Sequence, residues 1–173
     1  MEIQEVTLTR FSEFVKIPYF AFNSGAFNNL HRAKCDRLFY LLFTDGKYRM
    51  GLIGGSIGDK FLSPISAPFG GFTFVAENVR LQHIEESIEA LNLWAVQNKF
   101  SLIRLILPPV IYHRTFLAKQ LNCLWRKGFE ISGIDLNYAF ELETFNEAYP
   151  DNIWYNARKN LHRSLAEELV FIE

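Results

Sequence analysis

The sequence predicts an α/β (α+β) unit with a mixed sheet flanked by helices. Two apolar runs, at residues 38–43 and 48–55, are separated by Asp45-Gly46, a turn pair that predicts a β-hairpin. Apolar residues then recur at helical spacing over 81–98, and a buried strand is predicted at 102–107. This succession is typical of layered α/β domains. With 173 residues, of which 49% are hydrophobic, the chain is long enough for one substantial core.

The segment before the hairpin is predicted to be short and mixed. The pattern at residues 3–8 indicates a first strand, and the apolar side chains of residues 10–15 predict a short helix. Residues 19–29 are rich in Phe, Asn and Gly and have no clear period, so we expect a loop that leads into a helical turn near Leu30. This loop is aromatic enough to line a pocket.

The remainder of the chain is predicted to alternate between strands and helices. Residues 60–62 indicate a third strand, whereas residues 63–71 contain two prolines and two glycines and cannot continue a strand or a helix. The further expected elements are a helix over 81–98, a strand over 102–107, a helix over 116–125, one or two closing strands within 131–142, a helix over 152–167 and a strand over 169–172. The abrupt apolar end indicates that the chain is cut from a longer protein.

Composition and charge exclude several classes of function. The formal net charge is −1, so no global attraction to nucleic acid or to an anionic membrane is expected. No signal peptide is evident and Arg104 interrupts the best apolar run, which predicts a cytoplasmic protein without a transmembrane segment. Cys35 and Cys123 lack CxxC spacing, so we expect two reduced, buried thiols and no metal site.

A glycine-rich stretch from Gly51 to Gly58 has two interpretations. Glycines let backbone N–H groups approach an anion closely, as in phosphate-binding loops. Such a loop opens a helix, however, and this stretch leads into another predicted strand without a following Gly-Lys-Ser/Thr. We therefore favour a structural hairpin in which the glycines mark bulges or close approach.

Two loops carry candidate substrate-binding residues. In the loop at 63–71, two prolines fix the path of the chain, and its candidate residues are Ser63, Ser66, Phe69, Gly70 and Gly71. The alternative is a rigid crossover that only positions the following helix.

The second loop follows a buried strand end, where open α/β sheets commonly bind ligands, and contains Tyr112, His113 and Arg114. His113 is a candidate general base, and a helix-capping or surface role is its alternative.

The last predicted helix carries a basic stripe. Arg158, Lys159 and Arg163, with His162, recur at i, i+4 spacing, which suits a phosphate or carboxylate ligand. A solvated helix face is the alternative. No zinc-protease motif, nucleophile elbow or P-loop is present, so no catalytic residue is assigned and an independent hydrolase is not expected.

Four stretches, in order, resemble the N-terminal half of Fem-like proteins of the GNAT acyltransferase superfamily. They are Ser63-Pro-Ile-Ser-Ala-Pro-Phe-Gly-Gly-Phe72, Leu107-Pro-Pro-x-Ile-Tyr-His113, Gly133-Ile-Asp-Leu-Asn-Tyr138 and Ala157-Arg-Lys-Asn-Leu-x-Arg-Ser164. The likeness spans residues 38–164. It implies a GNAT-like, mostly antiparallel sheet over 1–150, followed at 151–173 by a basic linker helix and strand that lead to a missing second domain.

The resemblance also implies an activity, namely transfer of an acyl or aminoacyl group to an amine. The implied donor is acetyl-CoA or another acyl or aminoacyl donor, and aminoacyl-tRNA enters by family resemblance only. The implied acceptor is a small-molecule or peptidoglycan-precursor-like amine. The implied protein partner is a second GNAT-like domain or a second copy of the chain.

The sequence departs from the family at the usual CoA loop. Ordinary GNAT enzymes hold the pyrophosphate with a Gln/Arg-x-x-Gly-x-Gly/Ala loop that opens the helix after the fourth strand. Here Gly70-Gly71 is followed by bulky Phe72, and residues 79–82 contain no glycine. Two hypotheses follow: an N-acyltransferase half without a complete CoA loop, or a non-catalytic GNAT-like module that binds a ligand or a partner domain. A weaker third hypothesis is an adaptor that uses the aromatic loop at 19–27 for protein contact.

Overall fold

The computed structural model describes residues 1–16, 20–75, 78–139, 143 and 149–167. The chain divides into two compact units, Met1–Ile134 and Asp135–Glu173. The predicted domain division at residue 150 stays a prediction.

The first unit is built on a mixed, mostly antiparallel six-stranded sheet. Its strands are β1 (Glu2–Val6), β2 (Arg37–Thr44), β3 (Tyr48–Ile57), β4 (Lys60–Ser63), β5 (Phe72–Phe74) and β6 (Leu102–Leu105). The sheet order is β1-β2-β3-β4-β6, and β5 pairs separately with the first half of β3. Only β4 and β6 are parallel among the described strand pairs. The predicted fold class and the predicted hairpin are therefore confirmed.

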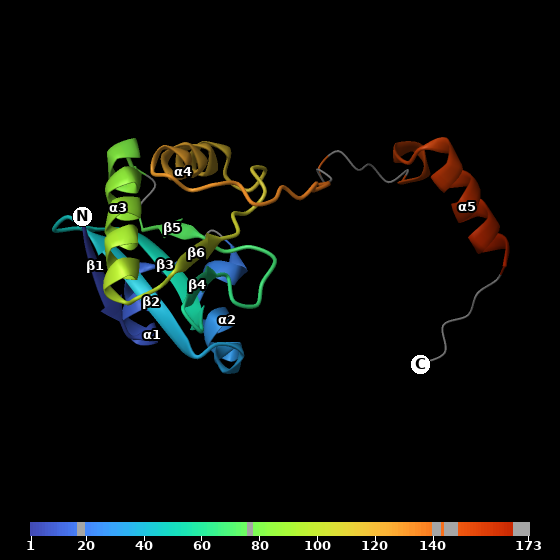
Figure 1. Ribbon diagram of the computed structural model, residues 1–173. Helices are drawn as coiled ribbons and strands as arrows, with labels where there is room; N and C mark the ends of the chain where they lie inside the picture. Colours follow the sequence, from blue (N-terminus) through green and yellow to red (C-terminus); the bar gives the residue numbers. More distant parts are fainter. Residues whose placement is uncertain (17–19, 76–77, 140–142, 144–148, 168–173) are drawn as a thin grey trace. The chain divides into compact units, whose positions relative to one another are not determined.

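Helices cover both faces of this sheet (Figure 1). They are α1 (Leu8–Phe14), α2 (Gly25–Leu30), α3 (Leu81–Gln97) and α4 (Arg114–Arg126), with short 3-10 turns η1 (Ala21–Asn23) and η2 (Arg32–Lys34). The α1–α2 layer lies on one face and the α3–α4 layer on the other. The structure confirms the predicted helices at 81–98 and 116–125, because their apolar stripes meet the core.

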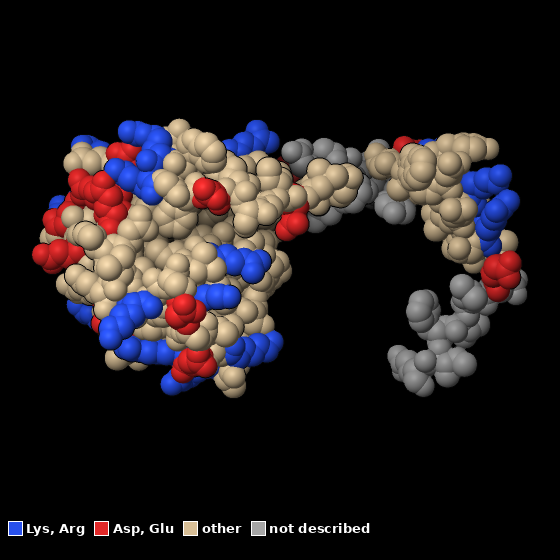
Figure 2. Space-filling model, viewed as in Figure 1, with Lys and Arg blue, Asp and Glu red and all other residues tan. Residues whose placement is uncertain are grey.

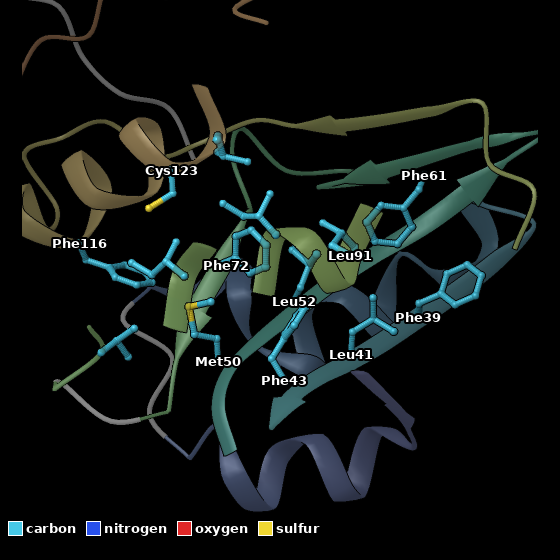
Figure 3. Close-up of a cluster of buried hydrophobic side chains, with 14 residues drawn as sticks. Phe39, Leu41, Phe43, Met50, Leu52, Phe61, Phe72, Leu91, Phe116 and Cys123 are labelled. Atoms are coloured by element: carbon cyan, nitrogen blue, oxygen red, sulfur yellow. The ribbon is translucent and has the colours of Figure 1, made fainter. Parts of the chain in front are cut away.

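The main core lies between the sheet and the α3–α4 layer. Its fully buried side chains include Phe43, Phe61, Phe72, Ile88 and Leu91. Figure 3 shows these strand side chains pointing toward α3, with Phe116 and Cys123 of α4 at one end of the cluster. Ring pairs such as Phe43–Phe72, with centroids 5.3 Å apart and rings edge to face, give this core a specific packing.

A second, smaller core lies on the α1–α2 face. The segment before β2 corrects one expectation, and the glycines of β3 show close approach, one of the two roles expected for them. Residues 19–29 were expected to form a loop, but their described part contains η1 and α2 because Ser24 Oγ accepts a hydrogen bond from Phe27 N and caps α2. The glycines of β3 lie in a regular ladder and not at bulges. At Gly51, a Cβ atom would lie 2.8 Å from the Phe11 ring, so this glycine lets α1 approach the sheet closely.

The second unit contains η4 (Tyr149–Asn152) and α5 (Tyr155–Ala166). The predicted helix at 152–167 is therefore confirmed, while the predicted strand at 169–172 lies outside the described residues. The predicted closing strand is wrong over 131–139, where the chain forms no strand. The physical reason is that an alternating sequence makes a strand only where another strand offers hydrogen-bond partners. Residues 140–142 lie outside the described part.

Candidate functional site

The candidate site lies where the parallel strands β4 and β6 end. Parallel neighbours end at the same edge of a sheet, so the loops that follow them, at 64–71 and 106–113, leave side by side. Two backbone hydrogen bonds of 2.8 Å join these loops and strands: Gly70 N donates to Ile106 O, and Ile106 N donates to Ser63 O. The structure therefore brings the two sequence-predicted loops together.

Ser63 joins both ends of the 64–71 loop. Its hydroxyl donates to Ile53 O at 2.6 Å and accepts from Gly71 N at 3.1 Å, and the side chain is only 1% exposed. Gly70 is held just as tightly, because a Cβ atom there would lie 2.9 Å from Pro64 N. Gly71 has φ of +81°, a left-handed conformation that favours glycine. These predicted substrate-binding residues are thus buried, and they fix the shape of the loop.

Asn23 attaches the same loop to the α1–α2 layer. Its Nδ2 donates to Gly71 O at 3.2 Å and to Thr73 Oγ1 at 2.7 Å. The side chain is buried, and its Oδ1 has no hydrogen-bond partner among the described residues. Sequence reasoning missed Asn23, because it lies in a segment without a period. The sequence held no signal that singled it out, because the same stretch also contains Ser24, Asn28 and Asn29.

An aromatic cluster connects three distant parts of the chain at this site. Phe69 packs against Phe20 and Phe22 with ring centroids 4.9 and 5.1 Å apart. Tyr112 stacks on Phe69 at 5.3 Å and on Phe20 at 6.0 Å. Phe69 is buried, whereas Tyr112 remains 53% exposed. The cluster therefore extends from the buried Phe69 ring to the surface, where the phenol of Tyr112 is exposed.

The middle of the 64–71 loop faces solvent more than its ends do. Ser66 is half-buried, and its hydroxyl accepts a 2.7 Å hydrogen bond from Lys34 Nζ. Lys34 belongs to η2, so a cation from a third segment reaches the rim of the site. Among the predicted residues of this loop, Ser66 alone is both partly exposed and hydrogen-bonded to a charged side chain. Its position is compatible with contact to a polar or anionic ligand.

His113 and Arg114 begin α4 beside Tyr112. His113 Nδ1 accepts a 3.2 Å hydrogen bond from Phe116 N, and its ring packs against Phe74 at 5.2 Å. The structure therefore shows the helix-capping role for His113 that the sequence offered as an alternative. Because Nδ1 accepts this hydrogen bond, Nε2 carries the hydrogen of the neutral ring. Arg114 is exposed at the first position of the helix.

Gln120 of α4 is a polar side chain that sequence reasoning missed. It is 0% exposed, and neither Oε1 nor Nε2 has a hydrogen-bond partner among the described residues. Its Oε1 lies 3.8 Å from the place where a Cβ atom of Gly71 would be. A buried amide without hydrogen-bond partners lowers the stability of the folded state, so its presence here is unusual. The indication in the sequence was a glutamine within the apolar stripe of the helix.

The two cysteines are free. The predicted burial is confirmed for Cys123, whereas Cys35 is only half-buried. Burial raises the pKa of both thiols above its ordinary value, so neither is a thiolate at neutral pH. Within the described part of the chain, no three His, Cys, Asp or Glu side chains are placed to hold a metal ion.

The predicted anion-binding residues belong to the second unit. Arg158, Lys159 and Arg163 lie with Tyr155 and His162 along one side of α5, where they line a shallow depression. Figure 2 shows Lys and Arg gathered along this helix. No residue of α5 is buried. This basic face is therefore a solvent-exposed surface of the second unit.

The fold and site define an α+β protein with a mixed six-stranded sheet and a loop site at the ends of its parallel strands. Compared with protein-family models, with curated proteins and with solved structures, the chain matches none of them. Among the described residues, no helix has the length and apolar character needed to cross a membrane.

Proposed function

We propose that this chain is an N-acyltransferase half-domain of the Fem-like GNAT type, with the paired loops at 64–71 and 106–113 forming the wall of an acceptor-amine site. In the proposed reaction, the amine nitrogen attacks the carbonyl carbon of an activated acyl donor. The leaving group departs with the bonding electron pair, and the nitrogen loses a proton. No covalent bond to the protein is formed.

The observation that carries this proposal is the contact between Phe69 and Tyr112. Each belongs to a different stretch of the family resemblance, and their rings lie 5.3 Å apart at the ends of the parallel strands. The mixed, mostly antiparallel sheet with a long helix between β5 and β6 also agrees with the expected architecture. Ligands commonly bind beyond the carboxyl ends of strands in α/β sheets, where loops from neighbouring strands converge.

Residues of the first unit supply groups suited to acyl transfer. Tyr112 and Ser66 offer hydroxyl groups at the rim, and the departing group or solvent accepts the amine proton, because the acceptor nitrogen of His113 is occupied by the cap of α4. The unpartnered amide of Gln120 is a candidate donor to a developing oxyanion if the site opens toward Gly71. Such a role would account for a buried amide that the fold itself does not use.

A specific observation favours the second hypothesis, a non-catalytic GNAT-like module. The backbone N–H groups of Gly70 and Gly71, the glycines nearest the expected CoA loop, already donate to Ile106 O and to Ser63 Oγ. They are therefore not available to hold a pyrophosphate. On this hypothesis the loops bind a ligand or a partner domain, and the transfer chemistry is absent.

Calorimetric titration of the whole chain with acetyl-CoA separates the two hypotheses. Saturable binding, with CoA release when primary amines are added, supports the transferase. A Tyr112→Ala variant is then expected to lower CoA release at least about tenfold through loss of the acceptor wall. Trp125→Ala, which removes a comparably exposed aromatic side chain of α4 (64% against 53% for Tyr112), is the matched control and should leave the rate unchanged. No binding at millimolar acetyl-CoA would support the module instead.

A further inference from the structure

An apolar segment that follows α4 has no cover in the structure. Ile134, Leu136 and Tyr138 are 86%, 79% and 84% exposed, and they alternate with Asp135 and Asn137. Alternation of this kind is typical of a strand with one buried face. Yet residues 131–139 form no strand with any described residue. The segment therefore has the sequence of a strand without a pairing partner.

The sheet has a matching unpaired edge at β6. This strand ends the order β1-β2-β3-β4-β6, and no described strand pairs with its far side. Ile103 and Leu105 pack against the main core, whereas Leu102 is exposed. An unpaired strand edge presents backbone N–H and C=O groups that can accept another strand.

The other end of the sheet is a poorer acceptor. β1 carries Glu2, Gln4 and Glu5 on its five residues, and charged side chains on an edge strand oppose pairing. Asp135 of the exposed segment would add a like charge there. β6 instead carries Arg104, which forms no ion pair with any described residue. Charge thus favours β6 over β1.

The two faces of the segment also match the two faces of β6. If Ile134, Leu136 and Tyr138 continue the core side of the sheet, they extend the apolar row of Ile103 and Leu105. Asp135 and Asn137 then lie on the same side as Arg104, because side chains alternate along both strands. One placement therefore satisfies the apolar side chains and the opposite charges together.

We propose that residues 134–138 of one copy of the chain pair with the β6 edge of a second copy, and that the exchange is reciprocal. In a two-fold arrangement each copy contributes one segment and one β6 edge, so both segments and both edges are paired. Three large side chains bury roughly 450 Å² on the segment, at about 150 Å² each, the lower end of the aromatic range. Four such surfaces, two segments and two edges, total roughly 1,800 Å², within the range of stable interfaces.

Analytical ultracentrifugation of the whole chain over a concentration series tests this proposal. The wild-type chain is expected to form a dimer. Leu136→Asp, which places a charge in both symmetric contacts, should raise the dissociation constant at least about a hundredfold. Leu165→Asp makes the same change on α5 at a leucine that is 67% exposed, and it should leave the dimer intact.

A charge exchange tests the pairing without altering an apolar side chain. Arg104→Glu should weaken the dimer, and the double variant Arg104→Glu/Asp135→Arg should restore it. Amide hydrogen exchange should show protection at 102–106 and 134–138 that rises together with protein concentration. A chain that stays monomeric at all concentrations would overturn the proposal. In such a monomer, protected amides at 134–138 would indicate that the segment pairs within one chain, and unprotected amides that it does not pair at all. Equal dissociation by Leu165→Asp would overturn it as well.

Discussion

Replacement of Gln120 by methionine is expected to stabilise the first unit. The glutamine side chain is fully buried, and neither atom of its amide has a partner among the described residues. A buried polar group without a hydrogen bond costs about 1–3 kcal/mol. Methionine has nearly the same length and shape but needs no hydrogen bond. We therefore expect the free energy of unfolding to rise by about 2 kcal/mol, after allowance for imperfect packing of the thioether.

Urea unfolding followed by circular dichroism measures this change, with Gln97→Met as the matched control. Gln97 is exposed near the end of α3, so its replacement should alter the free energy of unfolding by less than about 0.5 kcal/mol. For Gln120→Met, the melting temperature should rise by roughly 6 °C, at about 3 °C per kcal/mol for a unit of this size. A loss of more than about 1 kcal/mol would refute the reasoning, because it would show that the amide is hydrogen-bonded in solution.

Two further predictions concern the surroundings of this site. Asn23→Leu removes the hydrogen bonds to Gly71 and Thr73 and leaves their oxygens buried, so the free energy of unfolding should fall by about 2–4 kcal/mol in urea titrations. Asn122→Leu, on the exposed side of α4, is its control, and an equal loss there would contradict the assigned role. For Cys123, burial raises the folded-state pKa, so stability is fully present below the ordinary thiol pKa of 9.0 and is lost as pH rises through the raised value. Cys123→Val should flatten this alkaline decline, and an unchanged pH profile would sink the explanation.

The long helices and the hairpin could be predicted from the sequence because their periods are strong. The apolar stripe of α3, with Ile84, Ile88, Leu91 and Ala95 buried, is visible without a structure. The helix α2 could not be predicted in this way, because its six residues, with one Gly and two Asn, show no period. It depends on the Ser24 cap and on the contact of Gly25 with α1 and β2. Local pattern fails where tertiary contacts decide the conformation.

The candidate site was partly predictable for a related reason. Two loops that each follow a strand end can be recognised in the sequence, but their adjacency depends on β4 and β6 being parallel neighbours. The burial of Ser63, Gly70 and Gly71 was not predictable, since serine and glycine are common in exposed loops as well. The contribution of Asn23 depends on a contact across 48 residues, for which no local pattern exists.

The double hydrogen bond of Ser63 has a consequence for how this molecule can change over time. Ser63 and Gly71 hold the two ends of the loop and Ile65 packs against Gly55 of β3, so the residues at 66–68 are the part of the loop least tied to the strands. Substitutions among them alter what the rim presents to a visiting molecule and leave the registration of β3 with β4 and β5 untouched. Within this one short loop, the middle residues are thus free to change for binding, while the end residues maintain the fold.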